Sequence, residues 1–202
     1  MSRTPAPPQP VESMTAAQLA RRERVLDAVV ELVAAGRLDD MGMKDVAERS
    51  GVALGTIYRY FSSKDHLAAA ALLAWATRLE APSAETPSAE TPSPGAGMAD
   101  RLVAILRRAV RAYEREPSFA RLLILAATST DPYAGECYAR LGSSVYDTLG
   151  SALDGLDPVD RRRVLDVVGA VWYQALTEWV RGRRTIADVY DQVESAARLV
   201  LP

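Results

Sequence analysis

Apolar residues recur at intervals of three or four along most of this chain, which is the period of an amphipathic α-helix. No stretch keeps up, over five or more positions, the alternation of apolar and polar residues that indicates a β-strand. The spacing predicts about nine helices, which we expect over residues 16–35, 43–50, 54–60, 63–80, 99–115, 117–129, 134–153, 158–182 and 186–201. The predicted fold class is therefore all-α.

Residues that favour helix starts and stops lie at several of these ends. Gly36 follows the first predicted helix, where a left-handed residue commonly ends a helix. Ser62 and Asp65 have the spacing of a capping box before the helix at 63–80. Pro117 and Pro158 lie where a first helical turn accepts proline.

Two segments fall outside the helical pattern. Residues 1–14 hold four of the twelve prolines, and residues 81–97 contain the pentapeptide PSAET twice in tandem. Segments so rich in proline, serine and threonine bury too little apolar surface to offset the entropy lost on ordering. We expect a disordered N-terminal tail and a flexible loop between two groups of helices.

The composition narrows the possible functions. The 202 residues include one cysteine and one histidine, which excludes an intrachain disulfide and a Cys/His zinc site. The N-terminus lacks the apolar region of a secretory signal, and no apolar run approaches the length of a membrane span. Glycine-rich phosphate loops and hydrolase motifs are also missing. We therefore expect a cytoplasmic protein that is not an enzyme and uses no metal, cofactor or membrane.

The segment from Met43 to Leu67 has the spacing of two short helices that cross through a tight turn. Ala47 is small where the second helix would pass over the first, and Gly51 lies in the turn, where a positive φ suits glycine. The apolar residues for the contact between the two helices are Val46, Val52 and Ile57. This pattern is typical of a helix-turn-helix, which places its second helix in the major groove of DNA.

A plain αα-hairpin has a similar spacing, so the outward-facing residues decide between these alternatives. The second helix carries polar and aromatic side chains of the kind that contact phosphates and base edges. They are Thr56, Tyr58, Arg59 and Tyr60, and Lys64 follows them. Residues 1–66 contain nine Lys and Arg and nine Asp and Glu, so any basic surface must be local.

The same segment resembles the DNA-binding domain of the TetR family of bacterial regulators, over about residues 20–75. The matching residues are Gly36, Lys44 to Ala47, Gly51–Val52, Gly55 to Phe61 and Lys64. Met43 and Ala53 depart from the family pattern, because they occupy the N-cap positions of the two short helices and offer no side-chain acceptor. The resemblance implies a helix-turn-helix domain at residues 15–62 and a larger ligand-binding and dimerisation domain at 63–202.

The resemblance also assigns roles to individual side chains. Those implied to contact phosphates or to reach the DNA backbone and adjacent minor groove are Arg21, Arg22, Lys44, Tyr58 and Lys64. Those implied to enter the major groove are Leu54, Gly55, Thr56, Arg59 and Tyr60. Leu54 and Gly55 would permit close approach, and the other three would contact base edges. For Arg21 and Arg22 a solvated charged face is the alternative.

The predicted helix at 158–182 is apolar on most of its circumference between residues 164 and 180. A surface helix has one apolar stripe, so this helix needs partners on two sides. One would be its own domain, and the other a second copy of the chain, which together with the helix at 186–201 would form a four-helix bundle. The alternative is a buried core helix of a monomer. The candidate interface residues are Val164, Val168, Val171, Trp179, Val189, Val193 and Val200.

The apolar residues of the helices between 99 and 153 either form an ordinary core or line a cavity. The candidate pocket residues are Leu106, Val110, Tyr113, Leu122, Leu125, Tyr138, Leu141, Val145, Trp172 and Leu176. A weaker resemblance of the C-terminal part to actinobacterial repressors of cholesterol catabolism implies a small hydrophobic effector, such as a steroid or an acyl thioester. That resemblance is carried by Val171–Trp172, Leu176, Trp179, Asp188–Val189 and Ala197 to Leu199. Four arginines could contact a phosphate-bearing part of such an effector or form a solvated face. They are Arg107, Arg108, Arg111 and Arg115.

The sequence thus predicts a regulator, a repressor by its resemblance, that binds a palindromic DNA operator as a homodimer and is released by its effector. The alternative is a helical interaction protein that does not bind DNA. The salt dependence of DNA affinity would separate the two, because phosphate contacts impose a steep slope.

Overall fold

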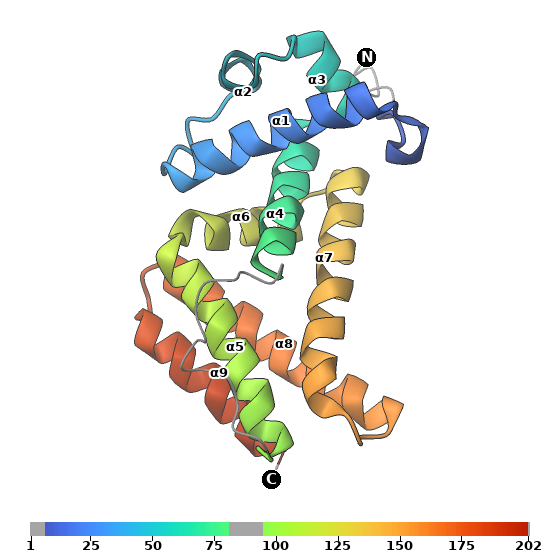
Figure 1. The fold of residues 1–202 in the computed structure, drawn as a ribbon. Coiled ribbons are helices and arrows are strands. Elements are labelled where there is room, and N and C mark those ends of the chain that lie inside the picture. The colour runs from blue at the N-terminus through green and yellow to red at the C-terminus, as the bar shows by residue number, and fades with distance from the viewer. Residues whose placement is uncertain (1–6, 81–94, 202) are drawn as a thin grey trace. The chain divides into compact units, whose positions relative to one another are not determined.

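The computed structural model describes residues 7–80 and 95–201. These residues form nine α-helices and two short 3-10 helices, with no strand among them (Figure 1). In chain order the elements are η1 (Val11–Ser13), α1 (Ala16–Ala34), α2 (Met43–Ser50), α3 (Leu54–Tyr60), α4 (Lys64–Glu80), α5 (Met98–Arg115), α6 (Pro117–Thr128), α7 (Pro132–Gly150), η2 (Ser151–Leu153), α8 (Pro158–Val180) and α9 (Ile186–Val200). The all-α prediction is confirmed, and the predicted helix ends differ from these by three residues at most.

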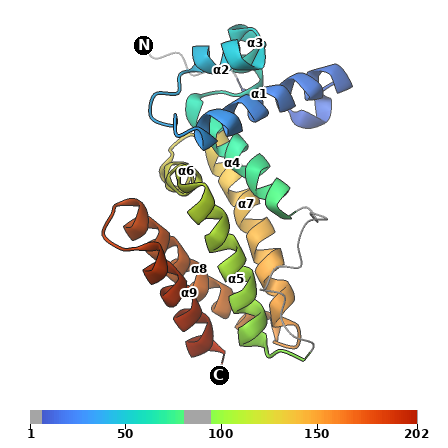
Figure 2. The same ribbon diagram turned by 60° about the vertical axis from the view of Figure 1, so that its left-hand side comes forward.

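The first of two compact units comprises the chain up to Glu80 together with Leu122–Leu141. In this unit α1 packs against α2 and α4, and α3 packs against α1 and α2 (Figures 1 and 2). The apolar face of α1 fills the core through Val25, Val29 and Val33, which are completely buried. Thr15 begins α1 with a capping box: the Gln18 side-chain oxygen accepts from the Thr15 N–H at 2.8 Å.

Residues 7–14 contradict the prediction of a disordered tail. Val11–Ser13 form η1, and Met14 is 9% exposed. The N–H of Gln9 donates to the carbonyl of Arg59 at 2.9 Å, so the segment before α1 lies against the end of α3. Proline fixes φ and lowers the entropy that ordering costs, so a proline-rich segment can be ordered by a few backbone hydrogen bonds. The first six residues of the predicted tail lie outside the described part of the chain.

The second unit comprises residues 81–121 and 142–202. Here α5 and α8 both pack against α9, as both ribbon views show (Figures 1 and 2). The Asp157 carboxylate begins α8 by accepting from the N–H groups of Val159 and Asp160 at 2.8 and 3.1 Å. Thr185 and Asp188 form a capping box at the start of α9.

The two compact units do not follow the predicted domain boundary after residue 62. Helix α4 belongs to the first unit, because it packs on α1. The domain limits at 15–62 and 63–202 stay a prediction. The predicted loop at 81–97 lies outside the described residues except for its last three, of which Gly97 is the N-cap of α5.

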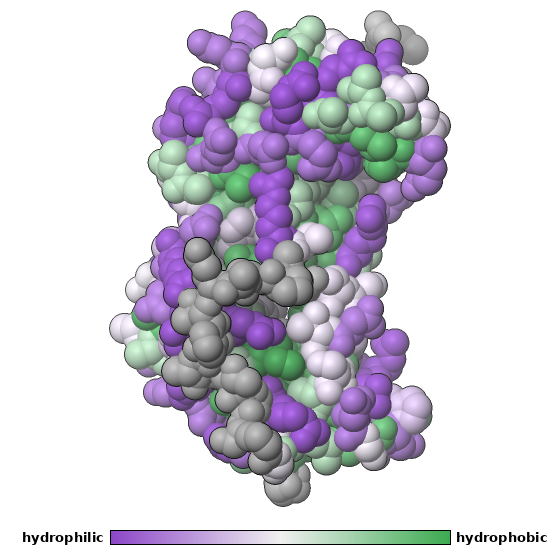
Figure 3. All heavy atoms as spheres, viewed as in Figure 1, coloured by the Kyte–Doolittle hydropathy of each residue, from purple (hydrophilic) through white to green (hydrophobic). Residues whose placement is uncertain are grey.

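The surface of the first unit is mostly polar where Figure 3 shows it. Hydrophilic residues cover most of its visible face, and pale or hydrophobic side chains lie between them (Figure 3). In the described parts of the chain, no helix combines the length and the apolar character needed to cross a membrane.

Candidate nucleic-acid interface

Helices α2 and α3 form the predicted helix-turn-helix and are joined by Gly51, Val52 and Ala53. Gly51 has a φ of +65°, in the left-handed region that suits glycine, and turns the chain directly after α2. Val46, Val52 and Ile57 are each at most 4% exposed. The predicted apolar contact between the two helices is therefore confirmed.

The start of α2 differs from the prediction. Met43 is the first helical residue, and the N-cap is Gly42, whose N–H donates to the Asp45 carboxylate at 2.8 Å. Asp45 thus satisfies the N–H of the N-cap residue, which is the half of a capping box that does not depend on the N-cap side chain. Ala53 is the N-cap of α3 and makes no side-chain hydrogen bond, as predicted. Its carbonyl oxygen accepts from the N–H groups of Thr56 and Ile57 at 2.8 and 3.1 Å.

Three of the ten residues predicted to contact DNA are exposed on the outward face of α3. Tyr58 is 48% exposed, and Gly55 and Arg59 are exposed beside it. Of the other predicted residues, Lys44 is exposed, and Leu54, Thr56 and Lys64 are partly exposed. A Cβ atom added to Gly55 would meet no other atom within 4 Å. Packing inside the chain therefore gives no reason for glycine at this position.

Tyr60 does not belong to this face, which corrects its predicted contact with a base edge. The residue is 2% exposed, and its hydroxyl is enclosed with no hydrogen-bond partner among the described residues. Tyr60 follows Ile57 by three positions and so shares the buried side of α3. Helical spacing therefore contained the signal for its burial, although tyrosine is common at DNA interfaces.

The two predicted arginines of α1 have different surroundings. The Arg22 guanidinium lies 5.1 Å from the centre of the Phe61 ring, and its Nε is enclosed without a hydrogen-bond partner among the described residues. Burial lowers the pKa of this guanidinium from its usual value. Arg22 is partly exposed and packs against Phe61, and its predicted contact with the DNA backbone stays a prediction. Arg21 is exposed and donates from Nε only to the Ala17 carbonyl, at 3.0 Å.

The junction between α3 and α4 is held by a network that sequence reasoning missed. The N-cap of α4 is Ser63 rather than the predicted Ser62, because the Ser63 hydroxyl accepts from the His66 N–H at 3.0 Å. The same hydroxyl donates to the Asp131 carboxylate at 2.5 Å, and Ser62 donates to it at 3.2 Å. The Asp131 carboxylate also caps α7 by accepting from the Tyr133 and Ala134 N–H groups at 2.8 and 3.2 Å. One carboxylate therefore joins the starts of α4 and α7.

His66 completes this junction as a neutral ring. Its Nδ1 accepts from the Ser62 N–H at 3.1 Å, and the ring stacks on Tyr133 with 5.5 Å between centroids. Burial lowers the pKa of His66 to about 4, although the nearby Asp131 opposes that change. Burial of Asp131 is outweighed by the hydrogen bonds from Ser63 and from the α7 N–H groups, so its pKa is lowered. The junction is thus built from a neutral histidine and an ionised carboxylate.

The candidate pocket residues divide between the two units. Those in the first unit are Leu122, Leu125, Tyr138 and Leu141, and those in the second are Leu106, Val110, Tyr113, Val145, Trp172 and Leu176. Most are buried, but Leu125 and Val145 are 38% and 40% exposed. In the second unit the rings of Tyr113 and Trp172 meet edge to face, 6.0 Å apart. None of the ten lines either of the two surface pockets described for the second unit.

The candidate dimer residues also divide into two groups. Val164, Val168, Val189 and Val193 are at most 8% exposed within one chain, in the core that α8 and α9 share. The partly exposed members are Val171, Trp179 and Val200. Val167 and Leu199, which the sequence analysis did not select, are 48% and 83% exposed. Helical periodicity marked the helix at 158–182 as apolar on more than one side, but it did not identify which side of α8 or α9 faces outward.

Two family profiles cover most of the described chain. The one described as bacterial regulatory proteins, tetR family, matches residues 25–71. The one described as the C-terminal domain of tetracyclin repressor-like proteins matches residues 95–200. The second alone covers more than half of the 202 residues.

Individual relatives agree with these profiles. The HTH-type transcriptional repressor KstR of Rhodococcus jostii is 31% identical over 92% of this chain and 84% of its own length. KstR of Mycobacterium tuberculosis is 29% identical over 92% and 82%. A crystal structure of a TetR transcriptional regulator from Rhodococcus sp. RHA1 superimposes with a TM-score of 0.75 at 28% identity, covering 91% of this chain and 96% of that one.

A more distant structure shares the fold. It is the transcriptional regulator FadR from Bacillus subtilis in complex with stearoyl-CoA, with a TM-score of 0.60 and 18% identity, covering 89% of this chain and 97% of that one. The profile matches, the KstR relatives and the observed helix-turn-helix agree with one another. The chain therefore belongs to the tetR family of bacterial regulatory proteins and is a DNA-binding, ligand-responsive transcriptional regulator.

Proposed function

We propose that the protein is a repressor that binds a palindromic operator as a homodimer and leaves it when a small hydrophobic effector binds. The observation that carries the proposal is the outward face of α3, where Tyr58 and Arg59 are exposed beside Gly55. The relatives named KstR are repressors by their names, which supports repression rather than activation.

The outward side chains have distinct roles in this proposal. Arg59 and Thr56 contact base edges, and arginine can pair bidentately with guanine in the major groove. Tyr58, Lys44 and Lys64 contact phosphates, and Arg21 reaches the backbone from α1. Leu54 and Gly55 lie where α3 approaches the groove. Tyr60 is left out, because it packs into the core of the first unit, whereas Arg22, which is partly exposed, is kept beside Arg21.

The homodimer is proposed to form through the outward sides of α8 and α9. Val167 and Val171 are one helical turn apart on α8, and Leu199 and Val200 lie at the end of α9. Leu199 and Val167 are 83% and 48% exposed in the single chain, so both are apolar side chains on the outward sides of these helices that a partner would cover. Gel filtration with light scattering on Leu199→Glu and Val167→Glu should show a shift towards monomer. Val159→Glu, at another exposed valine of α8, is the matched control.

The effector is proposed to be a steroid or an acyl thioester. The similarity to KstR repressors supports a hydrophobic ligand, and the structural neighbour FadR from Bacillus subtilis holds an acyl thioester, stearoyl-CoA. Such an effector releases DNA when it binds the DNA-free conformation of the protein more tightly than the DNA-bound one. The free energy of DNA binding is weakened by the difference between these two binding free energies. Release of a labelled operator on addition of steroids or acyl thioesters, followed by fluorescence anisotropy, tests this part.

Selection of bound DNA from a random pool, at two salt concentrations, tests the proposed function as a whole. An enriched inverted repeat whose affinity falls with salt is the expected result. An enriched sequence without two-fold symmetry would contradict the dimer. If nothing is enriched even after unfolding and refolding to remove bound ligand, the chain is an interaction protein without DNA binding.

A further inference from the structure

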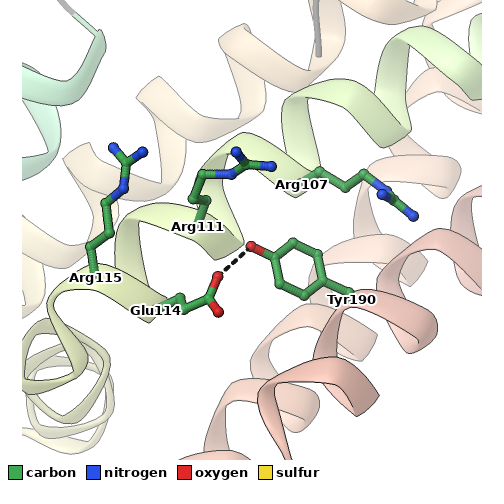
Figure 4. Close-up of a pocket in the computed structure, with 5 residues that line it drawn as sticks. All are labelled: Arg107, Arg111, Glu114, Arg115 and Tyr190. Carbon is green, nitrogen blue, oxygen red and sulfur yellow. Dashed lines mark hydrogen bonds between the residues drawn. The ribbon is translucent and has the colours of Figure 1, made fainter. Parts of the chain in front are cut away.

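A surface pocket of the second unit is lined by Arg107, Arg111, Glu114, Arg115 and Tyr190 (Figure 4). We call it the arginine pocket. The three arginines follow one another at intervals of four, so they project from the same side of α5, and Tyr190 reaches them from α9. The pocket encloses about 540 Å³, which is within the range of small-molecule sites.

The charges in the arginine pocket are unbalanced. Three arginines face the lining carboxylate of Glu114, and Arg107 is also paired with Glu194 beside the pocket. Counting both carboxylates, the formal charge is +1 in a chain whose net charge is −2. Glu114 is already engaged, because its carboxylate accepts from the Tyr190 hydroxyl at 2.8 Å. Burial and this carboxylate raise the pKa of Tyr190 to about 12, so the ring adds no negative charge.

The arginines differ in how far they are already satisfied. Arg107 donates from Nε to Glu194 at 3.1 Å, and Glu194 also accepts from Arg198 at 3.0 Å. Arg115 makes no hydrogen bond or ion pair with any residue in the described parts of the chain, and its guanidinium points away from α5 in the close-up (Figure 4). Arg111 is already engaged, because its side chain hydrogen-bonds to Tyr190. A further anion would therefore find Arg115 unengaged, one helical turn from Arg111.

We propose that the arginine pocket binds the linked phosphate groups of a small anion. A guanidinium offers two parallel N–H donors that match two oxygens of one phosphate. Residues 107 and 115 are eight positions apart, or about 12 Å along α5. A row of that length can contact two or more phosphates in one molecule, whereas a lone carboxylate needs one arginine. The inference rests on the proposed function in one respect: the anion is taken to be the charged part of the effector.

Another surface pocket of the second unit also contains arginines, so the presence of arginines does not by itself indicate an anion site. That pocket is lined by Asp147, Asp154, Arg161 and Arg162 among others, so its charges cancel. Arg161 is also paired with Asp154 at 3.7 Å. An anion entering it would meet two carboxylates, and we assign phosphate binding to the arginine pocket alone.

Isothermal titration of the full chain with phosphate, pyrophosphate and coenzyme A, in the absence of DNA, tests the proposal. Pyrophosphate and coenzyme A should bind measurably more tightly than phosphate. Arg115→Ala should weaken both by about tenfold, which is the typical loss of one charge-assisted contact. Arg108→Ala removes the same charge from α5 at an exposed position outside the pocket and is the matched control. Because Arg115 has no partner among the described residues, its loss should leave the thermal melting curve unchanged.

Each outcome of this titration decides something. Tighter binding of coenzyme A than of pyrophosphate identifies an organic molecule as the source of the phosphates, and tighter binding of pyrophosphate identifies the inorganic anion. Equal binding shows that the two linked phosphates account for all of the affinity, which also supports the proposal. No binding at millimolar concentrations, or equal losses in Arg108→Ala and Arg115→Ala, would overturn the proposal. Operator binding by Arg115→Ala without ligand should match wild type, so a failure of DNA recognition is distinguishable from a failure of this site.

Discussion

Replacing Gly55 with alanine should have opposite effects on the stability of the protein and on its affinity for DNA. Gly55 is the second residue of the helix, is exposed, and has no atom within 4 Å of the place where a Cβ would lie. Alanine is the better helix former by about 0.5–1 kcal/mol in a helix interior. Because no internal contact opposes the added methyl, Gly55→Ala should be at least as stable as wild type in urea unfolding.

The same methyl group should weaken operator binding. If α3 approaches the groove closely at Gly55, the methyl must displace the helix by about one carbon–carbon bond, roughly 1.5 Å, a shift that lengthens several phosphate and base contacts. Loss of about tenfold or more in affinity, equivalent to about 1.4 kcal/mol, is the expected result. Fluorescence anisotropy with the operator recovered by selection measures this change at fixed salt.

A second glycine provides the control. Gly135 is also helical, exposed and free of neighbours within 4 Å, but it lies on α7. Gly135→Ala should gain similar helix stability and retain full DNA affinity. Wild-type affinity of Gly55→Ala would refute the proposed close approach of α3, and a loss of stability would refute the account of its surroundings.

Four further changes test other parts of the structure. Tyr60→Phe removes a buried hydroxyl without a partner, so urea unfolding should show stability unchanged or raised by about 1 kcal/mol, with operator affinity unaltered. Asp131→Ala should cost about 2–3 kcal/mol in the same assay, and the double variant with Ser63→Ala should cost less than the sum. Because burial lowers the pKa of His66 from 6.5 to about 4, the unfolded chain binds the extra proton between these values. Stability should therefore fall as the pH falls from about 6.5 to about 4, by at most about 3 kcal/mol, and His66→Asn should remove this dependence. Arg59→Ala should abolish the preference for one operator in a competition assay while leaving the melting curve unchanged.

The helices could be predicted closely because each signal is local. Residues three and four apart reveal an apolar face, and a capping side chain lies within three residues of the N–H that it serves. Val46, Val52 and Ile57 were therefore assigned correctly to the contact between α2 and α3. The exposed positions of Tyr58, Arg59 and Lys44 agree with the predicted DNA-facing set, although their contacts with DNA stay a prediction.

The errors arose where long-range contacts decide. Ser63 rather than Ser62 caps α4 through the His66 N–H, and sequence did not show that Asp131, 68 positions further along the chain, accepts from the same hydroxyl. Val168 was selected for the dimer because its helix is apolar on most of its circumference, and Val189 and Val193 because their helix was expected to complete a four-helix bundle. All three are completely buried in one chain. A single sequence gives the number of apolar faces on a helix, but it does not say which face meets its own chain.

The double use of the Ser63 hydroxyl has a consequence for local opening of the first unit. The His66 N–H donates to this hydroxyl, the hydroxyl donates to Asp131, and Asp131 accepts from the Tyr133 and Ala134 N–H groups. Fraying of either helix start removes a bond on which the other depends, so the two should open together. Hydrogen exchange of the amide protons of His66, Tyr133 and Ala134 should then give the same free energy of opening, once the intrinsic exchange rate of each amide is allowed for. The first turn of α4 and the first turn of α7, remote in sequence, would behave as one cooperative folding unit.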